Sequence, residues 1–94
     1  MDPFIETHRQ AILELAARRG AQRIQLFGSM AKDEGGPTSD VDFLVEMEPG
    51  KSAFALGGLL MDLQDLLGRR VDVVTPAALH PRIREQVLRE AVDL

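Results

Sequence analysis

With 94 residues, of which 45% are hydrophobic, the chain has the size and composition of one folded domain over residues 1–94. Its 11 basic and 15 acidic residues give a net charge of −4, which argues against direct binding of nucleic acid through the phosphate backbone. The absence of cysteine excludes disulfides and zinc–thiolate sites and favours a reducing, cytoplasmic setting. No signal peptide and no apolar run of the roughly 20 residues that span a membrane is recognisable, so membrane association is not expected.

The first part of the chain is predicted to form a helix and a strand. Apolar residues at helical spacing predict a helix from Phe4 to Arg19. A strand is expected from Arg23 to Phe27, and Gly28-Ser29 ends it. Ser29 can begin a short helical turn over residues 30–32, and the polar, glycine-rich stretch 33–39 is a loop.

The second part continues the alternation of helices and strands. Strands are expected from Asp40 to Met47 and from Arg70 to Thr75, with a helix from Ser52 to about Leu67 between them. Gly57-Gly58 inside that helix costs stability, and close packing against the sheet is the expected reason. A last helix begins near Pro81. Together these elements predict an α/β fold of order αβαβαβα.

Three aspartates are predicted to meet on one face of the sheet. Asp40 and Asp42 are two residues apart on a strand and therefore share a face. Asp72 holds a comparable position in the next strand, and it joins them if the two strands are neighbours in register. Three close carboxylates repel one another unless a cation lies between them, and an all-oxygen ligand set suits Mg²⁺ or Mn²⁺. A lone Asp-x-Asp is more often a solvated strand face, so the hypothesis depends on the whole set.

Gly28 and Ser29 are candidates for binding a phosphate group. Glycine lets the backbone approach a ligand closely, and Ser29 adds a hydroxyl beside N–H groups at the start of a helical turn. A Gly-Ser pair alone is usually only a turn. If the strands on either side of it run antiparallel, however, Gly28, Ser29, Asp40 and Asp42 lie at the same end of the sheet, and we predict that arrangement.

Several other charged residues allow two interpretations. Lys32 and Arg69 could contact phosphates, although a solvated position is the commoner outcome for Arg69. His8 lacks partners at metal-ligand spacing and is interpreted as a surface residue. The arginines of the last helix, Arg84 among them, are interpreted as a solvated face. The inner side of that helix is expected to consist of Ile83, Val87, Leu88 and Ala91.

These motifs resemble a known family. Gly28-Ser29, then ten residues, then Asp40-x-Asp42 is similar to the signature of the DNA polymerase β-like nucleotidyltransferases, and in particular of their minimal nucleotidyltransferase (MNT) branch. The resemblance extends over nearly the whole chain and includes Asp72 as the third acidic residue. It implies a polymerase β-like core with a small mixed sheet.

The resemblance also implies roles for these residues. Asp40 and Asp42 would bind two Mg²⁺ ions, and Asp72 would complete the metal site or help to deprotonate the attacking hydroxyl. Gly28 and Ser29 would hold a nucleoside triphosphate. Lys32, where many family members have arginine, would offer a single charge to phosphate. MNT proteins of this size resemble antitoxins that transfer AMP from ATP to a tyrosine of a HEPN ribonuclease toxin, which implies a hetero-oligomer with that toxin.

Two alternatives to this function follow from the same residues. The chain could be an antitoxin that only binds its toxin and retains a vestigial metal site. It could also transfer a nucleotidyl group to the hydroxyl of a small molecule, as related antibiotic-modifying enzymes do.

Overall fold

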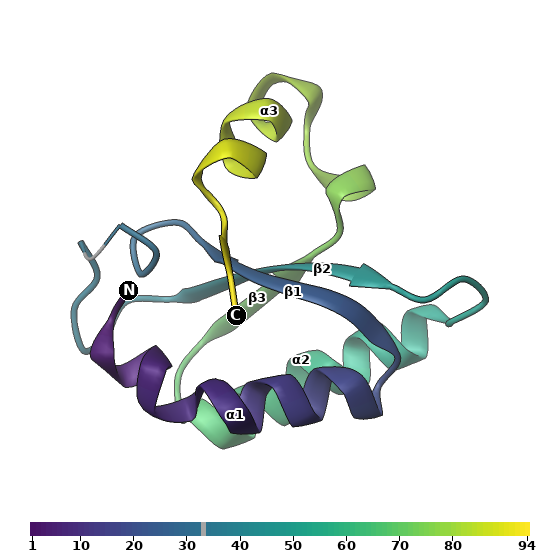
Figure 1. Cartoon of the computed structure of the whole chain (residues 1–94), viewed down its shortest axis with the longest axis horizontal. Helices are drawn as coiled ribbons and strands as arrows, with labels where there is room; N and C mark the ends of the chain where they lie inside the picture. Colours follow the sequence, from purple (N-terminus) through teal and green to yellow (C-terminus); the bar gives the residue numbers. More distant parts are fainter. Residues whose placement is uncertain (33) are drawn as a thin grey trace.

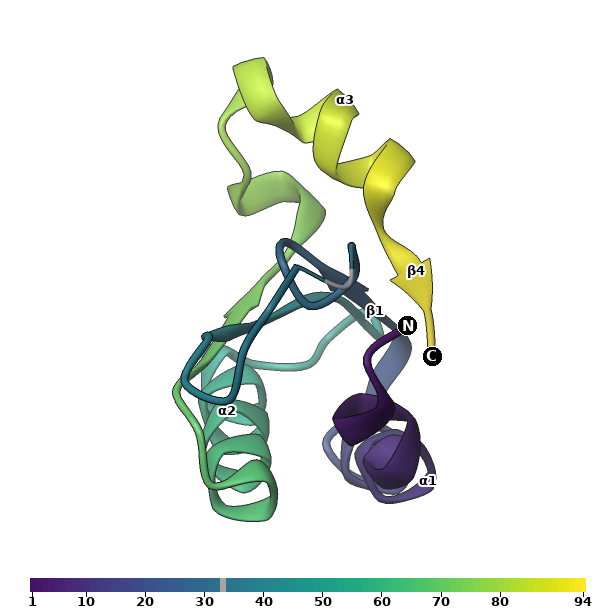
Figure 2. The same cartoon turned by 90° about the vertical axis from the view of Figure 1, so that its left-hand side faces the viewer.

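The computed structural model describes residues 1–32 and 34–94, so residue 33 of the predicted loop lies outside the described residues. In chain order the elements are α1 (Pro3–Arg18), β1 (Ala21–Phe27), β2 (Val41–Met47), α2 (Ala53–Leu67), β3 (Val71–Val74), the 3₁₀ helix η1 (Pro76–Ala78), α3 (Pro81–Glu90) and β4 (Val92–Asp93). The four strands form one sheet in the order β3-β2-β1-β4. Helices α1 and α2 cover one face of this sheet, and α3 stands on the other side (Figures 1 and 2).

The predicted fold class, an α/β fold with a small mixed sheet, is confirmed. Strand β1 runs antiparallel to β2 and β4, while β2 and β3 are parallel. Long helix α2 provides the connection that a parallel pair requires, and the short connection after β1 suits an antiparallel pair. The predicted antiparallel arrangement of the first two strands is therefore also confirmed.

The predicted element order lacks the 3₁₀ helix η1 after β3, and it differs from the structure in two further places. Between β1 and β2 the described residues form turns and no helix: the N–H groups of Ala31 and Lys32 donate to the carbonyls of Gly28 and Ser29, both at 3.2 Å. Gly28 has a left-handed φ of +77°, so the segment does not begin with helical geometry. The second difference is β4, a two-residue strand beyond the last helix that the sequence did not reveal.

The hydrophobic core lies between the sheet and the pair α1 and α2. Alternate residues of β2, namely Val41, Phe43 and Val45, are fully buried on this side, as the period of two predicts. The opposite face of β2 carries Asp42 and also Leu44, which is buried as well. The core therefore fixes which face of the sheet the aspartates occupy, because a shift of one residue would bury Asp42.

Helix α3 is attached at its two ends and contributes no buried residue to the core. At its start, the Arg84 guanidinium donates to the carbonyl oxygens of Pro76 (3.0 Å) and Leu79 (2.9 Å), so the prediction of a solvated Arg84 is wrong. At its end, β4 pairs with the edge of β1. Ile83 and Leu88, predicted to face inward, are 47% and 46% exposed.

None of the helices in the described part of the chain combines the length and the apolar character needed to cross a membrane.

Candidate functional site

The register of the sheet places Asp42 beside Asp72. The two residues are direct partners in the parallel pair of β2 and β3, and Phe27 is the partner of Asp42 on the other side, in β1. Partners in a sheet point to the same face, so Phe27, Asp42 and Asp72 form a row across three strands. Asp40 immediately precedes β2 and is exposed, like Asp72, whereas Asp42 is half-buried.

The surroundings of the Asp42 carboxyl disfavour its ionised form. Partial burial raises the pKa of Asp42, and the neighbouring charges of Asp72 and then Asp40 raise it further. Each of these causes disfavours the ionised form. A cation placed among the three carboxylates would reverse the two charge contributions, so the site is electrostatically suited to a positively charged ligand.

Gly28 is placed directly under the Asp42 carboxylate. A Cβ atom on Gly28 would lie 2.5 Å from Oδ2 of Asp42, which is closer than carbon and oxygen can approach. The left-handed φ of +77° also favours glycine at this position. The end of β1 and the start of β2 thus bring the Gly-Ser turn and the carboxylates together, as the antiparallel arrangement predicts.

The backbone after Gly28 is held by local hydrogen bonds. The carbonyl of Ser29 accepts from the N–H groups of Lys32 (3.2 Å) and Glu34 (2.9 Å). Farther along, Oγ of Ser39 accepts from the N–H of Gly36 at 2.8 Å, just before Asp40. These bonds hold the turn next to the carboxylates in a defined shape.

Lys32 makes a contact that the sequence did not predict. Its Nζ atom lies 3.2 Å from Oε2 of Glu90, at the end of α3. Hydrogen bonds from Gln86 and Lys32 lower the pKa of the Glu90 carboxyl. Lys32 therefore links the Gly-Ser turn to α3, and in this state its charge is already paired.

Arg69 supports the loop between β1 and β2, a role that sequence reasoning missed. Its guanidinium lies 3.9 Å from the centre of the Phe4 ring, and one of its nitrogens lies 3.4 Å from the carbonyl oxygen of Gly36 and 3.9 Å from the sulfur of Met30. The His8 ring also packs against the Phe4 ring, and the two ring centroids lie 4.7 Å apart. His8 is therefore half-buried and not the fully solvated surface residue that was expected. Arg69 thus fastens the loop to the start of α1.

The donor set at this face fits a magnesium ion completed by a ligand. Within residues 1–32 and 34–94, no three His, Cys, Asp or Glu side chains form a ready-made metal cage. Mg²⁺ rarely uses such a cage, because it is usually held by one or two carboxylates together with water and substrate phosphates. Asp42 and Asp72, adjacent in register with Asp40 at the edge, meet that requirement.

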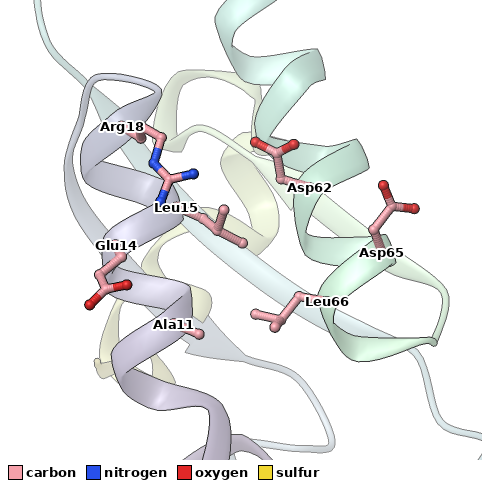
Figure 3. Close-up of a pocket in the computed structure, with 7 residues that line it drawn as sticks. All are labelled: Ala11, Glu14, Leu15, Arg18, Asp62, Asp65 and Leu66. Carbon is pink, nitrogen blue, oxygen red and sulfur yellow. The ribbon is translucent and has the colours of Figure 1, made fainter.

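A hollow of about 350 Å³ lies elsewhere, between α1 and α2 (Figure 3). Leu15 and Leu66 point toward each other across it, and charged side chains, Glu14 and Asp65 among them, also line it. Both helices lie on the side of the sheet opposite α3. This groove is therefore separate from the carboxylate face and contains none of the residues predicted for the site.

Comparisons with known proteins agree on one family. The family model described as "Nucleotidyltransferase domain" matches residues 5–94. Protein adenylyltransferase MntA of Thermococcus cleftensis is 42% identical over 92 residues, which cover 98% of this chain and 90% of that protein.

Solved structures show the same similarity. One that is described provisionally as a minimal nucleotidyltransferase has a TM-score of 0.88 and 46% identity, and the match covers 100% of this chain and 97% of the other. A variant of the toxin–antitoxin complex MntA–HpeT contains a chain with a TM-score of 0.73 and 26% identity, covering 92% of this chain and 70% of that one.

Proposed function

Because this chain belongs to the nucleotidyltransferase domain family, we propose that it transfers AMP from ATP to a tyrosine hydroxyl of a cognate HEPN ribonuclease and so acts as the antitoxin of that toxin. Membership of the minimal nucleotidyltransferase branch makes the chain an enzyme of the nucleotidyltransferase type. The identities of the nucleotide, the metal and the acceptor are the parts of this function that we propose.

The observation that carries the proposal is the position of Gly28 under the Asp42 carboxylate, with Asp72 in register beside it. A nucleotidyl transfer needs a backbone segment that binds the phosphates. Carboxylates that bind the metal must lie close to this segment. In the proposed reaction, the face of the sheet that bears Asp42 would provide both.

Each residue has a distinct part in the proposed reaction. Asp40 and Asp42 would hold Mg²⁺, with Asp72 completing the site, and the bound ion would neutralise charge on the phosphates and assist the attacking oxygen. Gly28 and Ser29 would receive the triphosphate through backbone N–H groups and the serine hydroxyl. The acceptor oxygen bonds to the α-phosphorus, the bond from that phosphorus to the β-phosphate oxygen breaks, and pyrophosphate leaves. Asp72, exposed beside Asp42, would take the proton of the hydroxyl.

The toxin as acceptor is supported by the relatives. Thermococcus cleftensis MntA is named a protein adenylyltransferase, and MntA–HpeT is a toxin–antitoxin complex. The exposed positions of Asp40 and Asp72 leave this face open to a protein substrate. The HEPN class of the toxin and its tyrosine come from the family resemblance described above.

The test combines the protein with ATP, Mg²⁺ and the proposed HEPN toxin, followed by intact-mass measurement of the toxin. We expect the toxin to gain AMP, and Asp42→Asn to reduce the initial rate roughly 100-fold or more. Asp65→Asn is the matched control, because Asp65 is an exposed aspartate on α2, away from the carboxylate face. An unmodified toxin, or equal rates for Asp42→Asn and the wild type, would contradict the proposal.

One observation favours the alternative of an antitoxin that inhibits by binding alone. Lys32, the cation nearest in sequence to the Gly-Ser turn, is paired with Glu90 and so does not offer its charge to a phosphate in this state. Neutralisation of the toxin by a doubly substituted Asp40→Ala/Asp42→Ala protein, without any mass change in the toxin, would establish that alternative.

A further inference from the structure

Gln25, in the middle of β1, is a buried polar residue whose side chain has no partner in the described part of the chain. It is 6% exposed, yet its amide forms no hydrogen bond with another described residue. Its neighbour in β4, Asp93, is instead bound by Arg23 at 2.9 and 3.2 Å. Side-chain amides that are this deeply buried are normally hydrogen-bonded, so the free amide of Gln25 calls for an explanation.

The amide of Gln25 is nevertheless open to a ligand. No side-chain nitrogen or oxygen of the described residues is fully enclosed without a partner, so both amide atoms of Gln25 keep some contact with solvent. The stem of the side chain is therefore held by its neighbours, while a donor and an acceptor at its tip remain unused. A group with this combination is already oriented before a ligand arrives, which lowers the entropic cost of binding.

The register of the sheet places Gln25 next to the row formed by Phe27, Asp42 and Asp72. Gln25 and Phe27 are two residues apart on β1 and share the carboxylate face, on the side of the sheet where α3 stands (Figure 2). The partner of Gln25 in β2 is Leu44, two residues beyond Asp42. The Cα atoms of Gln25 and Asp42 are therefore roughly 8 Å apart, about 7 Å along the strands and about 5 Å across them. A ligand that has its phosphates at the Gly-Ser turn can extend across Phe27 to Gln25.

The side chains around Gln25 on this face are apolar. Leu44, which is 1% exposed, lies between Gln25 and Val74 in the sheet. The half-buried ring of Phe27 lies on the side of Gln25 that is nearer to the carboxylates. One amide on an otherwise apolar surface suits a flat heteroaromatic ring, because the surface packs against the ring and the amide fixes its orientation.

The chemistry of an amide also selects among such rings. Its oxygen accepts and its nitrogen donates, so it pairs with a ring edge that presents a donor beside an acceptor. Adenine presents the N6 amino group beside N7, and glutamine pairs with both. Guanine presents two acceptors, O6 and N7, at the same edge, so an amide forms only one of the two bonds there.

We propose that Gln25 binds the base of the nucleotide substrate and selects adenine: the amide oxygen accepts from the N6 amino group, the amide nitrogen donates to N7, and Phe27 packs against the ring. This inference rests on the proposed function, from which it takes the position of the phosphates at Gly28 and Ser29. It adds the residue that distinguishes ATP from GTP.

Isothermal titration of the protein with ATP and with GTP, each with Mg²⁺, measures base selection without any transfer reaction. The Kd of the wild type for ATP should be at least about 10-fold below that for GTP. Gln25→Met, which keeps the length of the side chain, should raise the Kd for ATP about 10-fold and change that for GTP less than about 3-fold. Gln22→Met is the matched control, because Gln22 is an exposed glutamine on the same strand and should leave both values unaltered.

Thermal unfolding without nucleotide separates binding from a structural role. Gln25→Met removes an amide that has no partner in the described chain, so its Tm should equal or exceed that of the wild type. A clearly lower Tm would show that the amide supports the fold and would overturn the inference. So would an unchanged preference for ATP in Gln25→Met, or equal losses of affinity for ATP and GTP.

The outcomes also distinguish this inference from the proposed function. A protein that selects ATP through Gln25 and leaves the toxin unmodified contradicts only the proposed function. A protein that modifies the toxin and shows the same nucleotide preference in Gln25→Met contradicts only the role of Gln25. Weaker binding of the toxin by Gln25→Met, with unchanged Kd values for both nucleotides, would assign the amide to the acceptor protein and overturn the inference.

Discussion

Gly28 and Asp42 occupy positions that exclude any side chain on Gly28: a Cβ there would lie 2.5 Å from Oδ2 of Asp42. The contact joins the residue that follows β1 to the second residue of β2. It therefore couples the shape of the Gly-Ser turn to the orientation of the half-buried carboxylate. Several predictions about the site depend on this pair and on the groups around it.

Gly28→Ala should abolish most of the activity. The methyl group displaces the Asp42 carboxylate, and the left-handed backbone adds about 1–2 kcal/mol of destabilisation. Gly50→Ala separates the two effects, because Gly50 has a φ of +86° but nothing within 4 Å of the position of its Cβ. Urea unfolding should show that the free energy of unfolding falls by similar amounts in both variants. Only Gly28→Ala should lose roughly 100-fold or more in kcat/KM. Equal activities of the two variants would disprove the coupling.

The raised pKa of Asp42 makes stability depend on pH in the absence of metal. The folded state holds the proton more tightly than the unfolded state, so ionisation of Asp42 costs stability. This cost is absent below the ordinary value of 3.8 and fully present above the raised pKa. In EDTA near pH 7, Asp42→Asn should therefore unfold at a higher temperature than the wild type, and the difference should disappear towards pH 3.

Magnesium should reverse the order of the unfolding temperatures of Asp42→Asn and the wild type. Since the ion offsets the repulsion among the carboxylates, Mg²⁺ should raise the Tm of the wild type more than that of Asp42→Asn. Asp65→Asn, on the opposite side of the sheet, should follow the wild type throughout. A Tm of Asp42→Asn below that of the wild type in EDTA at neutral pH would show that burial and repulsion do not disfavour the ionised Asp42 carboxylate.

Arg69→Ala should loosen the loop between β1 and β2 while leaving the carboxylates in place. It removes the stacking on Phe4 and the hydrogen bond to Gly36, which together are worth about 1–2 kcal/mol. We expect KM for ATP to rise about 10-fold with a smaller change in kcat, and amide hydrogens in residues 29–32 and 34–39 to exchange faster. Arg69→Lys should restore little, because an ammonium lacks the planar face that stacks on the ring.

The control for this prediction is Arg70→Ala. Arg70 is exposed, and the contact by which it supports β2 is made by its backbone carbonyl, which accepts from the N–H of Val41 at 3.0 Å. Its substitution should leave KM and hydrogen exchange unchanged. If Arg69→Ala leaves the exchange of the loop unaltered, Arg69 does not hold that loop.

Glu90→Gln should release Lys32 from α3. Both side chains are in contact with solvent, so the loss of this pair should cost little stability. If Lys32 contacts the triphosphate once it is released, KM for ATP falls several-fold in Glu90→Gln and rises in Lys32→Met. Glu85→Gln, which breaks an exposed pair with Arg89 within α3, provides the comparison. Identical KM values in all three variants would assign Lys32 to the attachment of α3 alone.

The sequence was sufficient to predict the strands that carry the aspartates. It was insufficient to predict the contacts that hold the neighbouring loop and β4. The period of two predicted that Asp42 points away from the buried face of β2. Asp72 was expected beside it only if the two strands were neighbours in register, and the structure shows that they are. Arg69 could not be predicted, because its three contacts come from segments 33 or more residues away in the chain. The two residues of β4 show no strand pattern of their own. Their position depends on pairing with β1 and on Asp93, which accepts two hydrogen bonds from Arg23.

Helix α3 is connected to the sheet by η1 at one end and by β4 at the other, and none of its residues is buried. Substitutions along its length consequently leave the core and the carboxylates intact. The surface that α3 presents to solvent can therefore vary at little cost in stability. Divergence among related chains should therefore concentrate in this helix, while the buried residues of the sheet, α1 and α2 are retained.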